Sequence, residues 1–398
     1  MGKRYIELLA PAGDLEKLKV ALLYGADACF IGGKKFSLRS RASNFTLEDI
    51  KEGCEFAHKL GKKIHVTCNI VMHNNDLDGL EKYLKDLEAC GVDAIITSSL
   101  YMAKLVRRIT KMEAHISTQE SSLNEEAVEY FYKQGATRVV LGRECSLDDI
   151  EKICKNKPCE IEAFIHGGMC SSYSGRCMLS NIMTRRDANR GGCAHSCRWK
   201  YKLYNDEELI TKGEEYFSMS SKDLCSLKEV RKMIDIGVDS LKIEGRMKSL
   251  NYIACIVKAY REVISDYLND LPYNEEKYNF YLDACENRDT SYGFLHGEVK
   301  EEGQLFNLDL MLKKAGEFIG IVKKYDEDNH ICYLELKNKI IAGEKYIVLS
   351  STNLPKEILI DRFYVQGEEK DVYSVASSII TFKCEEHLLP YDIIRLKK

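Results

Sequence analysis

Short apolar runs recur along residues 1–245, and a glycine precedes most of them. The segments that begin at Gly25, Gly61, Gly91, Gly135 and Gly237 share one order, which is glycine, a short polar step and a nearly continuous apolar run. Such a glycine can end a helix in the left-handed conformation, and a continuously apolar run is typical of a strand buried on both faces. The pattern therefore predicts buried strands that each follow a helix.

Polar capping residues stand where the intervening helices would begin. Asp14, Thr46, Asp76, Asn124 and Ser146 each precede an amphipathic stretch. Side-chain oxygens at such positions accept hydrogen bonds from the first free N–H groups of a helix. Strands and helices therefore alternate, and this βαβ repeat builds parallel sheets.

The repeat predicts eight parallel strands. They fall at residues 5–9, 28–32, 63–69, 94–98, 114–118, 138–142, 160–166 and 240–244. Eight βα units over roughly 250 residues match a closed (β/α)8 barrel. The alternative is an open, doubly wound sheet, but the first strand is not followed by the glycine-rich turn of dinucleotide-binding sheets. We therefore predict an α/β fold with a TIM-like barrel.

A change of pattern after the long helix expected at Tyr252–Asn269 marks a second unit. From Gly316 onward apolar and polar residues alternate in short runs, as in Cys332–Lys337 and Ile379–Lys383. Such runs predict a small antiparallel β-barrel. We place the barrel domain at residues 1–300 and the C-terminal β-barrel domain at 301–398, and we expect the latter to serve packing or partner docking.

The segment between the seventh and eighth predicted strands shows neither the apolar spacing of a helix nor that of a strand. It is rich in glycine, serine and arginine and carries Cys170, Cys177, Cys193 and Cys197, and Cys225 follows. Small, flexible residues let thiolates converge on one metal ion or cluster. We therefore predict a metal-binding insertion at about residues 166–225, at the end of the strands where barrel enzymes build their sites.

The cysteine spacing favours a cluster over a single ion. Six residues separate Cys170 from Cys177, fifteen separate Cys177 from Cys193, and three separate Cys193 from Cys197. Structural zinc sites use closely spaced pairs, and only the last pair has that form. Iron–sulfur clusters accept wider gaps between four thiolates. An iron–sulfur cluster is preferred, zinc is the alternative, and a disulfide framework is the weakest interpretation for sixteen cysteines in 398 residues.

The N-terminus predicts a cytoplasmic protein. Charged residues interrupt the apolar core that a signal peptide would need, and no run of about eighteen apolar residues predicts a membrane span. The net charge of −4 excludes no partner. Residues 185–202, however, carry six basic residues and one acidic residue, which indicates either a solvated face or a contact with an anionic partner.

Residues 162–180 are similar to the signature of the collagenase-like peptidase family, peptidase family U32, whose catalytic type is unknown. The matching positions are Glu162, Phe164, His166, Cys170, Gly175, Cys177, Leu179 and Ser180. Further blocks of resemblance follow the same order along nearly the whole chain, among them Asn44-Phe-Thr, Ser117-Thr-Gln, Asn189-Arg-Gly, Cys197-Arg-Trp, Ser221-Lys-Asp-Leu-Cys225 and Lys242-Ile-Glu-Gly-Arg.

The resemblance implies two kinds of function. The family name implies a peptidase, but several members resemble oxygen-independent hydroxylation factors with a 4Fe-4S cluster. Their branches act on wobble uridine of tRNA with prephenate as co-substrate, on ribosomal RNA, or on ubiquinone precursors. In length this chain resembles the tRNA branch most, which implies 5-hydroxyuridine formation. A homo-oligomer, a related second subunit and a non-catalytic metal-binding module remain open.

Carried onto this sequence, the resemblance implies Cys170, Cys177, Cys193 and Cys225 as cluster ligands, with Cys197 as an extra thiol. Proteolysis has little support from the residues. The sequence contains neither a zinc-binding His-Glu-x-x-His motif nor a Gly-x-Ser-x-Gly elbow. Cys170 with the nearby His166 could act as a nucleophile, but a thiolate that ligates iron is not free to attack a carbonyl.

Prephenate is a small dianion, and arginine binds carboxylates through paired hydrogen bonds. We expect the pocket at the carboxyl ends of the strands, where Gln119 joins the candidate catalytic residues Arg41, Asn69, His115, Arg143, His166, Glu244 and Arg246. Each has a structural alternative, such as an Arg246–Glu244 ion pair or a core position for His115. The candidates for nucleic-acid binding are Arg185, Arg186, Arg190 and Arg198, and the single Trp199 either stacks on a base or, more commonly, packs against the barrel.

Overall fold

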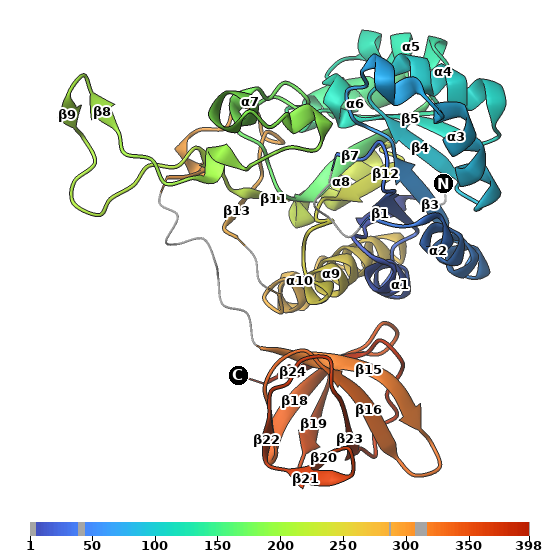
Figure 1. The fold of residues 1–398 in the computed structure, drawn as a ribbon, viewed down its shortest axis with the longest axis vertical. Coiled ribbons are helices and arrows are strands. Elements are labelled where there is room, and N and C mark those ends of the chain that lie inside the picture. Colours follow the sequence, from blue (N-terminus) through green and yellow to red (C-terminus); the bar gives the residue numbers. More distant parts are fainter. Residues whose placement is uncertain (1–4, 39–43, 286–287, 307–316, 398) are drawn as a thin grey trace.

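The computed structural model describes residues 5–38, 44–285, 288–306 and 317–397. Eight parallel strands form a closed barrel (Figure 1). They are β1 (Glu7–Pro11), β2 (Ala28–Gly32), β3 (Lys63–Thr67), β4 (Ala94–Thr97), β5 (Glu113–Ile116), β6 (Arg138–Val140), β7 (Glu160–Gly167) and β12 (Ser240–Ile243). Strand β12 pairs with both β1 and β7 and so closes the sheet. The predicted TIM-like barrel is confirmed, and the open sheet is excluded.

Helices cover the outside of the barrel and bury their apolar faces on the strands. They are α1 (Leu15–Leu23), α2 (Leu47–Lys59), α3 (Leu80–Ala89), α4 (Leu100–Ile109), α5 (Glu125–Lys133), α6 (Leu147–Lys155), α8 (Val230–Asp235), α9 (Leu250–Leu268) and α10 (Glu275–Leu282). Asp14, Thr46, Asn124 and Ser146 cap their helices as the sequence predicts. No helix in the described ranges has the length and apolar character needed to cross a membrane.

One predicted helix start is wrong. Asp76 lies in a short 3-10 turn, η1 (Asn74–Leu77), and α3 begins only at Leu80. The Asp76 carboxylate accepts hydrogen bonds from the backbone N–H of His73 and from the Arg190 guanidinium. Its oxygens are therefore committed to a tertiary contact, and the helix starts after Gly79, which adopts a φ of 74°.

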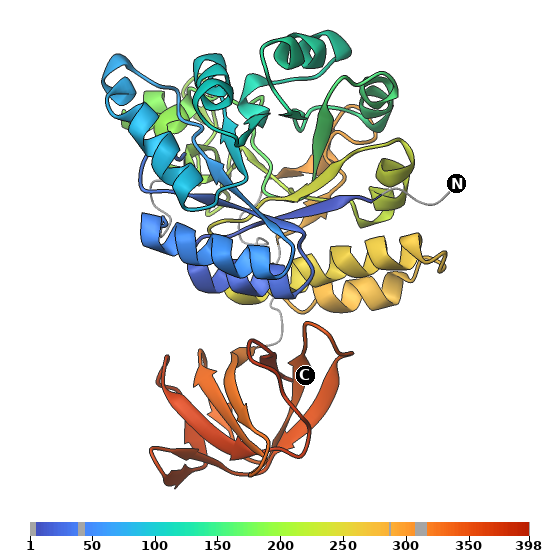
Figure 2. The same cartoon turned by 90° about the vertical axis from the view of Figure 1, so that its right-hand side faces the viewer.

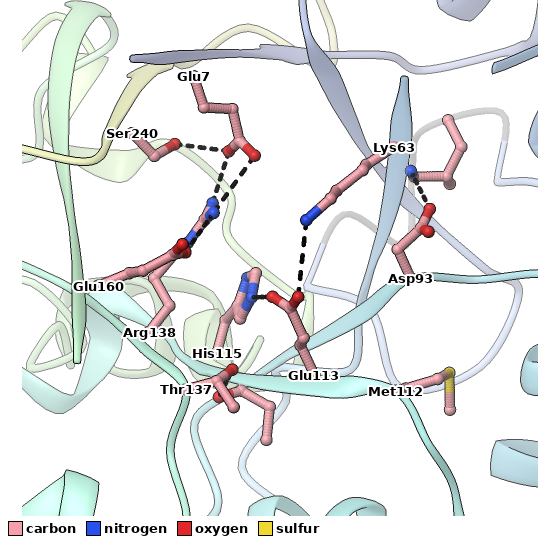
Figure 3. A network of polar contacts seen from close by, with 12 residues as sticks. Glu7, Lys63, Asp93, Met112, Glu113, His115, Thr137, Arg138, Glu160 and Ser240 are labelled. Carbon is pink, nitrogen blue, oxygen red and sulfur yellow. Dashed lines mark hydrogen bonds and ion pairs between the residues drawn. The ribbon is translucent and has the colours of Figure 1, made fainter. Parts of the chain in front are cut away.

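Charged side chains fill the barrel at the amino ends of its strands (Figure 3). The Arg138 guanidinium lies 2.5 Å from Glu7, 2.7 Å from Glu160 and 3.1 Å from Glu162. Burial alone would raise the pKa of Glu7, but Arg138 beside it holds that pKa well below its usual range. This end of the barrel is therefore closed by paired charges.

The cysteine-rich insertion leaves β7 and returns to β12. It contains α7 (Leu179–Thr184), the 3-10 turns η3 (Ala188–Arg190), η4 (Ser196–Arg198) and η5 (Leu227–Glu229), and the strands β8 (Tyr204–Asn205), β9 (Glu208–Leu209), β10 (Ser220–Ser221) and β11 (Asp223–Cys225). The β8–β9 hairpin projects away from the barrel (Figure 1). Strand β11 runs antiparallel to the end of β7 and pairs on its other side with β13 (Thr290–Ser291), while β10 pairs with β14 (Gln304–Leu305). The 3-10 turn η6 (Glu301–Gly303) precedes β14.

The C-terminal part folds as an antiparallel half-barrel with its own apolar core. Its main sheet runs in the order β19 (Lys356–Ile360), β18 (Glu344–Leu349), β24 (Ile393–Leu396), β15 (Phe318–Asp326), β16 (Ile331–Leu336), β23 (Ile379–Lys383), β20 (Phe363–Val365), β21 (Glu368–Lys370). Two short strands, β17 (Ile340–Ile341) and β22 (Val372–Tyr373), form a separate pair. The predicted antiparallel strands are confirmed.

This half-barrel lies beside α1 and α9 (Figure 2). The Tyr24 hydroxyl donates a hydrogen bond of 2.7 Å to the Leu349 carbonyl, and Lys258 donates one of 2.9 Å to the Ser351 carbonyl. The contact is thus on the helical flank of the barrel.

Candidate active site at the carboxyl ends of the strands

A cavity of about 180 Å³ lies where the barrel strands end and the insertion covers them. Its walls come from both parts of the chain, and they include Phe30, Ser37, Thr67, Asn69, Gln119, Arg143, Phe164, Lys242, Glu244 and Arg246 of the barrel and Cys170, Cys177, Cys193 and Cys197 of the insertion. This volume suits a small molecule, and the position is the one at which barrel enzymes bind their substrates.

Cations outnumber carboxylates on the cavity wall. Arg143, Lys242 and Arg246 line it, whereas Glu244 is its one carboxylate among the described residues. The Arg143 guanidinium stacks on the Phe164 ring, 3.6 Å from the ring centre, and lies 3.6 Å from Glu244. This Glu244 contact is longer than a direct hydrogen bond. The cavity therefore attracts small anions.

Contacts with neighbouring side chains hold the other two cations, Lys242 and Arg246, in place. The Lys242 ammonium lies 2.7 Å from the buried Glu162, and Lys242 and Arg138 outweigh burial and hold the pKa of Glu162 below its usual range. Arg246 donates hydrogen bonds of 3.0 Å to the hydroxyls of Ser37 and Thr67. These contacts fix where each positive charge stands before any ligand enters.

Two side-chain amides lock another part of the wall. Asn69 Nδ2 donates to Gln119 Oε1 at 2.7 Å, and Gln119 Nε2 donates to the Asn69 carbonyl at 2.9 Å. Ser117 donates a further bond of 3.1 Å to Gln119 Oε1. Asn69 and Gln119 are therefore positioned by each other, as rigid elements of the wall.

Four cysteines of the insertion line the cavity, and Cys225 does not. Cys170, Cys177, Cys193 and Cys197 line the wall, whereas the Cys225 sulfur packs 3.9 Å from the Tyr260 hydroxyl of α9. Burial raises the pKa of both Cys197 and Cys225. Within the described ranges no three metal-binding side chains stand in a closed ligand set. The donor chemistry at the cavity suits an iron–sulfur cluster, since four free thiols are among the residues of its wall.

Two predicted site residues lie away from the cavity. His115 is fully buried, and its Nε2 contacts Glu113 at 2.9 Å at the amino end of the barrel (Figure 3). His166 points toward α9, where its Nδ1 lies 3.2 Å from the Tyr260 hydroxyl. The expectation that both side chains share the rim with the arginines is wrong, because the pleat and the local pairing of β7 turn them elsewhere. Arg41 lies outside the described residues.

The arginines of the predicted basic run differ, since one is paired with an aspartate and the others are exposed to different degrees. Arg190 forms paired contacts of 2.6 and 3.2 Å with Asp76 and so ties the insertion to the barrel. Arg185 is exposed, and Arg186 and Arg198 are partly exposed. Trp199 is 40% exposed and stacks beside Tyr201, which corrects the expectation that it packs against the barrel.

Sequence reasoning missed Lys242, Phe30 and Phe164 as cavity residues. Lys242 had a usable signal, since it is a charged residue between the apolar Leu241 and Ile243 of a buried strand. Its Nζ lies 4.5 Å from the centre of the Phe30 ring. The aromatic walls gave no such signal, because a phenylalanine in a buried strand is ordinary core.

Comparisons with known proteins agree with this architecture. The model of peptidase family U32 matches residues 13–305, and the model of the peptidase family U32 C-terminal domain matches residues 315–395. The tRNA hydroxylation protein P1 of Bacillus subtilis is 44% identical over 411 residues, which cover 100% of this chain and 97% of that protein. The tRNA hydroxylation protein P of Escherichia coli is 33% identical, over 85% of this chain and 84% of its own length. A collagenase of Porphyromonas gingivalis is 35% identical, over 68% of each chain. The chain therefore belongs to peptidase family U32.

Proposed function

We propose that this chain hydroxylates the wobble uridine of tRNA to 5-hydroxyuridine without oxygen gas, with prephenate as the oxygen donor. The observation that carries the proposal is one small cavity with a cationic wall on the barrel side and four thiols on the insertion side. The names of the relatives from Bacillus subtilis and Escherichia coli support tRNA as the substrate.

The cationic wall suits the donor. Prephenate carries two carboxylates, and the Arg143 and Arg246 guanidinium groups can each bind one through paired hydrogen bonds. Lys242 adds a third positive charge at the floor, and the Phe30 and Phe164 rings supply apolar walls for the ring of the donor. In this account the three cations bind and orient the donor before the base arrives.

The proposed reaction oxidises the base. Hydroxylation replaces the hydrogen on C5 of uracil by a hydroxyl group, which is a two-electron oxidation of the base. The donor must therefore supply the oxygen atom and accept two electrons. A 4Fe-4S cluster would supply one-electron transfer at this position when bound. The protein's part is to hold donor and base next to it and to exclude water.

Cys170, Cys177 and Cys193 are the proposed ligands, together with a fourth thiolate from Cys197 or Cys225. The placement of Cys197 on the cavity wall favours Cys197, because Cys225 is packed against Tyr260. Measuring iron and sulfide in anaerobically purified Cys197→Ser and Cys225→Ser decides between them. Loss of the cluster only in the Cys225 variant would contradict the assignment of Cys197, and a colourless wild-type protein with one zinc would contradict the cluster itself.

A strain without the gene and without related genes of the same activity tests the function. Wild-type chain should restore 5-hydroxyuridine-derived nucleosides in digested tRNA, as measured by mass spectrometry. Cys177→Ser should not restore them, whereas Cys54→Ser, a buried thiol of α2, should. Equal amounts of these nucleosides with and without the wild-type gene would contradict the proposal.

Proteolysis is less well supported by the geometry. Cys225 is paired in register with His166, but burial raises the pKa of the thiol and lowers the pKa of the imidazole to about 4. A protonated thiol beside a histidine that resists protonation is a poor nucleophile pair. Ribosomal RNA stays an alternative substrate, because a 23S rRNA 5-hydroxycytidine C2501 synthase of Escherichia coli is 40% identical over 65% of this chain.

A further inference from the structure

A second group of cations stands outside the cavity, around the buried carboxylate of Asp223. Lys248 Nζ lies 3.5 Å from one carboxylate oxygen, and Arg288 Nη1 lies 3.4 Å from the other. The Arg198 guanidinium is close by, since a Cβ built on Gly168 would come within 3.6 Å of Arg198 Nη2 and 4.0 Å of Asp223 Oδ1. None of these four residues lines the cavity.

The charges in this group do not balance. Lys248 and Arg288 share the Asp223 carboxylate, the Arg198 guanidinium lies near them, and within the described ranges Arg198 has no ion pair of its own. Burial, and then the neighbouring Arg198, lower the pKa of the Arg288 guanidinium, as expected where like charges lie near one another. The side chains of Lys248 and Arg288 remain 26% and 20% exposed. An anion from solvent can therefore reach the group and relieve the repulsion.

The group adjoins the cavity along two segments of the chain. Arg198 follows Cys197, which lines the cavity, and Lys248 stands two residues after Arg246, which also lines it. Lys248 also precedes Ser249, the N-cap of the 19-residue helix α9, whose positive end adds to the same field. A nucleotide whose base enters the cavity would thus have its backbone close to these cations.

We propose that Arg198, Arg288 and Lys248 form a site for a backbone phosphate of the RNA whose base enters the cavity. This inference rests on the proposed function and extends it to the contact that positions the substrate. Asp223 holds two of the cations in place and leaves a net positive charge for the phosphate.

A polynucleotide fits better than a free phosphate ester, because an aromatic surface adjoins the cations. Trp199 follows Arg198 directly, is 40% exposed, and stacks beside Tyr201 with ring centres 6.5 Å apart. Exposed aromatic rings next to arginines are the usual surface on which proteins stack unpaired bases. One phosphate at the cations and one neighbouring base on Trp199 would orient a single-stranded segment.

The test measures the affinity of the full-length, iron-loaded protein for unmodified tRNA at several salt concentrations. Arg288→Gln should weaken binding several-fold near 0.1 M salt and lower the salt slope by about 0.7, the value for one phosphate contact of a single strand. Arg288→Lys keeps the charge and should retain most of the affinity. Arg362→Gln, which removes an exposed arginine of the C-terminal half-barrel, is the matched control and should change neither quantity.

Each outcome has one meaning. An Arg288→Gln protein with wild-type iron content, melting temperature, tRNA affinity and salt slope would overturn the site. Inorganic phosphate that competes with tRNA beyond the effect of equal ionic strength supports it. If phosphate binding depends on Arg288 but tRNA binding does not, the ligand is a small phosphate ester. This result would overturn the contact with the RNA backbone. If the wild-type protein does not bind tRNA at all, this result would instead contradict the proposed function.

Discussion

The two ends of the barrel use the same kinds of charged side chain in opposite ways. At the amino ends of the strands, Arg138 contacts three carboxylates, each within 3.1 Å. At the carboxyl ends, Arg143 approaches Glu244 only to 3.6 Å. A buried charge that is fully paired serves the fold, whereas a fixed charge with an incomplete partner is available to a ligand. We infer from this difference that one end serves stability and the other serves binding.

The largest effect should come from breaking the closed end. Arg138→Met removes the shared cation and leaves the buried Glu7 and Glu162 carboxylates without it, so the free energy of unfolding should fall by about 3–5 kcal/mol. Urea denaturation followed by circular dichroism measures this. A loss below about 1 kcal/mol would show that the network is not structural.

The corresponding change at the carboxyl ends of the strands, where the cavity lies, is Arg143→Gln. It should raise the KM for prephenate roughly ten- to a hundredfold, as expected for a lost hydrogen bond between charged groups, and change stability by no more than about 1 kcal/mol. Steady-state kinetics under anaerobic conditions measure the KM. A large stability loss with an unchanged KM would reverse the roles of the two ends.

Acid should weaken the closed end first. His65 of β3 is fully buried beside His115, with the two ring centres 4.9 Å apart. Burial lowers the pKa of His65 to about 3, so the unfolded chain takes up a proton that the folded protein refuses. Stability should therefore fall as the pH drops from about 6.5 toward 3, by up to about 1.4 kcal/mol per pH unit for this histidine. The lowered pKa of Glu7 adds a loss of the same sign below about pH 4.5. Unfolding midpoints at pH 7 and 5 should differ less in His65→Leu than in the wild type, and equal differences would contradict the assignment.

The smallest effect is expected at Arg190. Because Asp76 already neutralises this arginine, Arg190→Gln should leave the salt slope of tRNA binding unchanged and cost about 1 kcal/mol of stability at most. Arg185→Gln, at an exposed position of the same insertion, should lower the slope. A lower slope in the Arg190 variant would show that its pair with Asp76 opens when RNA binds.

The fold could be predicted because its signals are local. Glycines before apolar runs and caps such as Thr46 report the backbone at their own positions, and they gave the barrel and the insertion point. The direction of a side chain depends on tertiary pairing, which a sequence pattern does not show, so the pattern wrongly predicts His115 and His166 at the cavity. Arg190 was assigned to RNA because its partner Asp76 lies far away in the sequence. Arg143 and Arg246, which lie three residues beyond the ends of β6 and β12, line the cavity, and their role there stays a prediction.

Anaerobic incubation of the purified, iron-loaded protein with unmodified tRNA tests whether the chain hydroxylates tRNA at the expense of prephenate. Digested nucleosides would be analysed by mass spectrometry after reactions with and without prephenate. The proposed function predicts that wobble uridine gains one oxygen atom only when prephenate is present, and that Arg143→Gln needs more prephenate for the same yield. Hydroxylation that is independent of prephenate, or no hydroxylation together with cleavage of a peptide substrate, would contradict it.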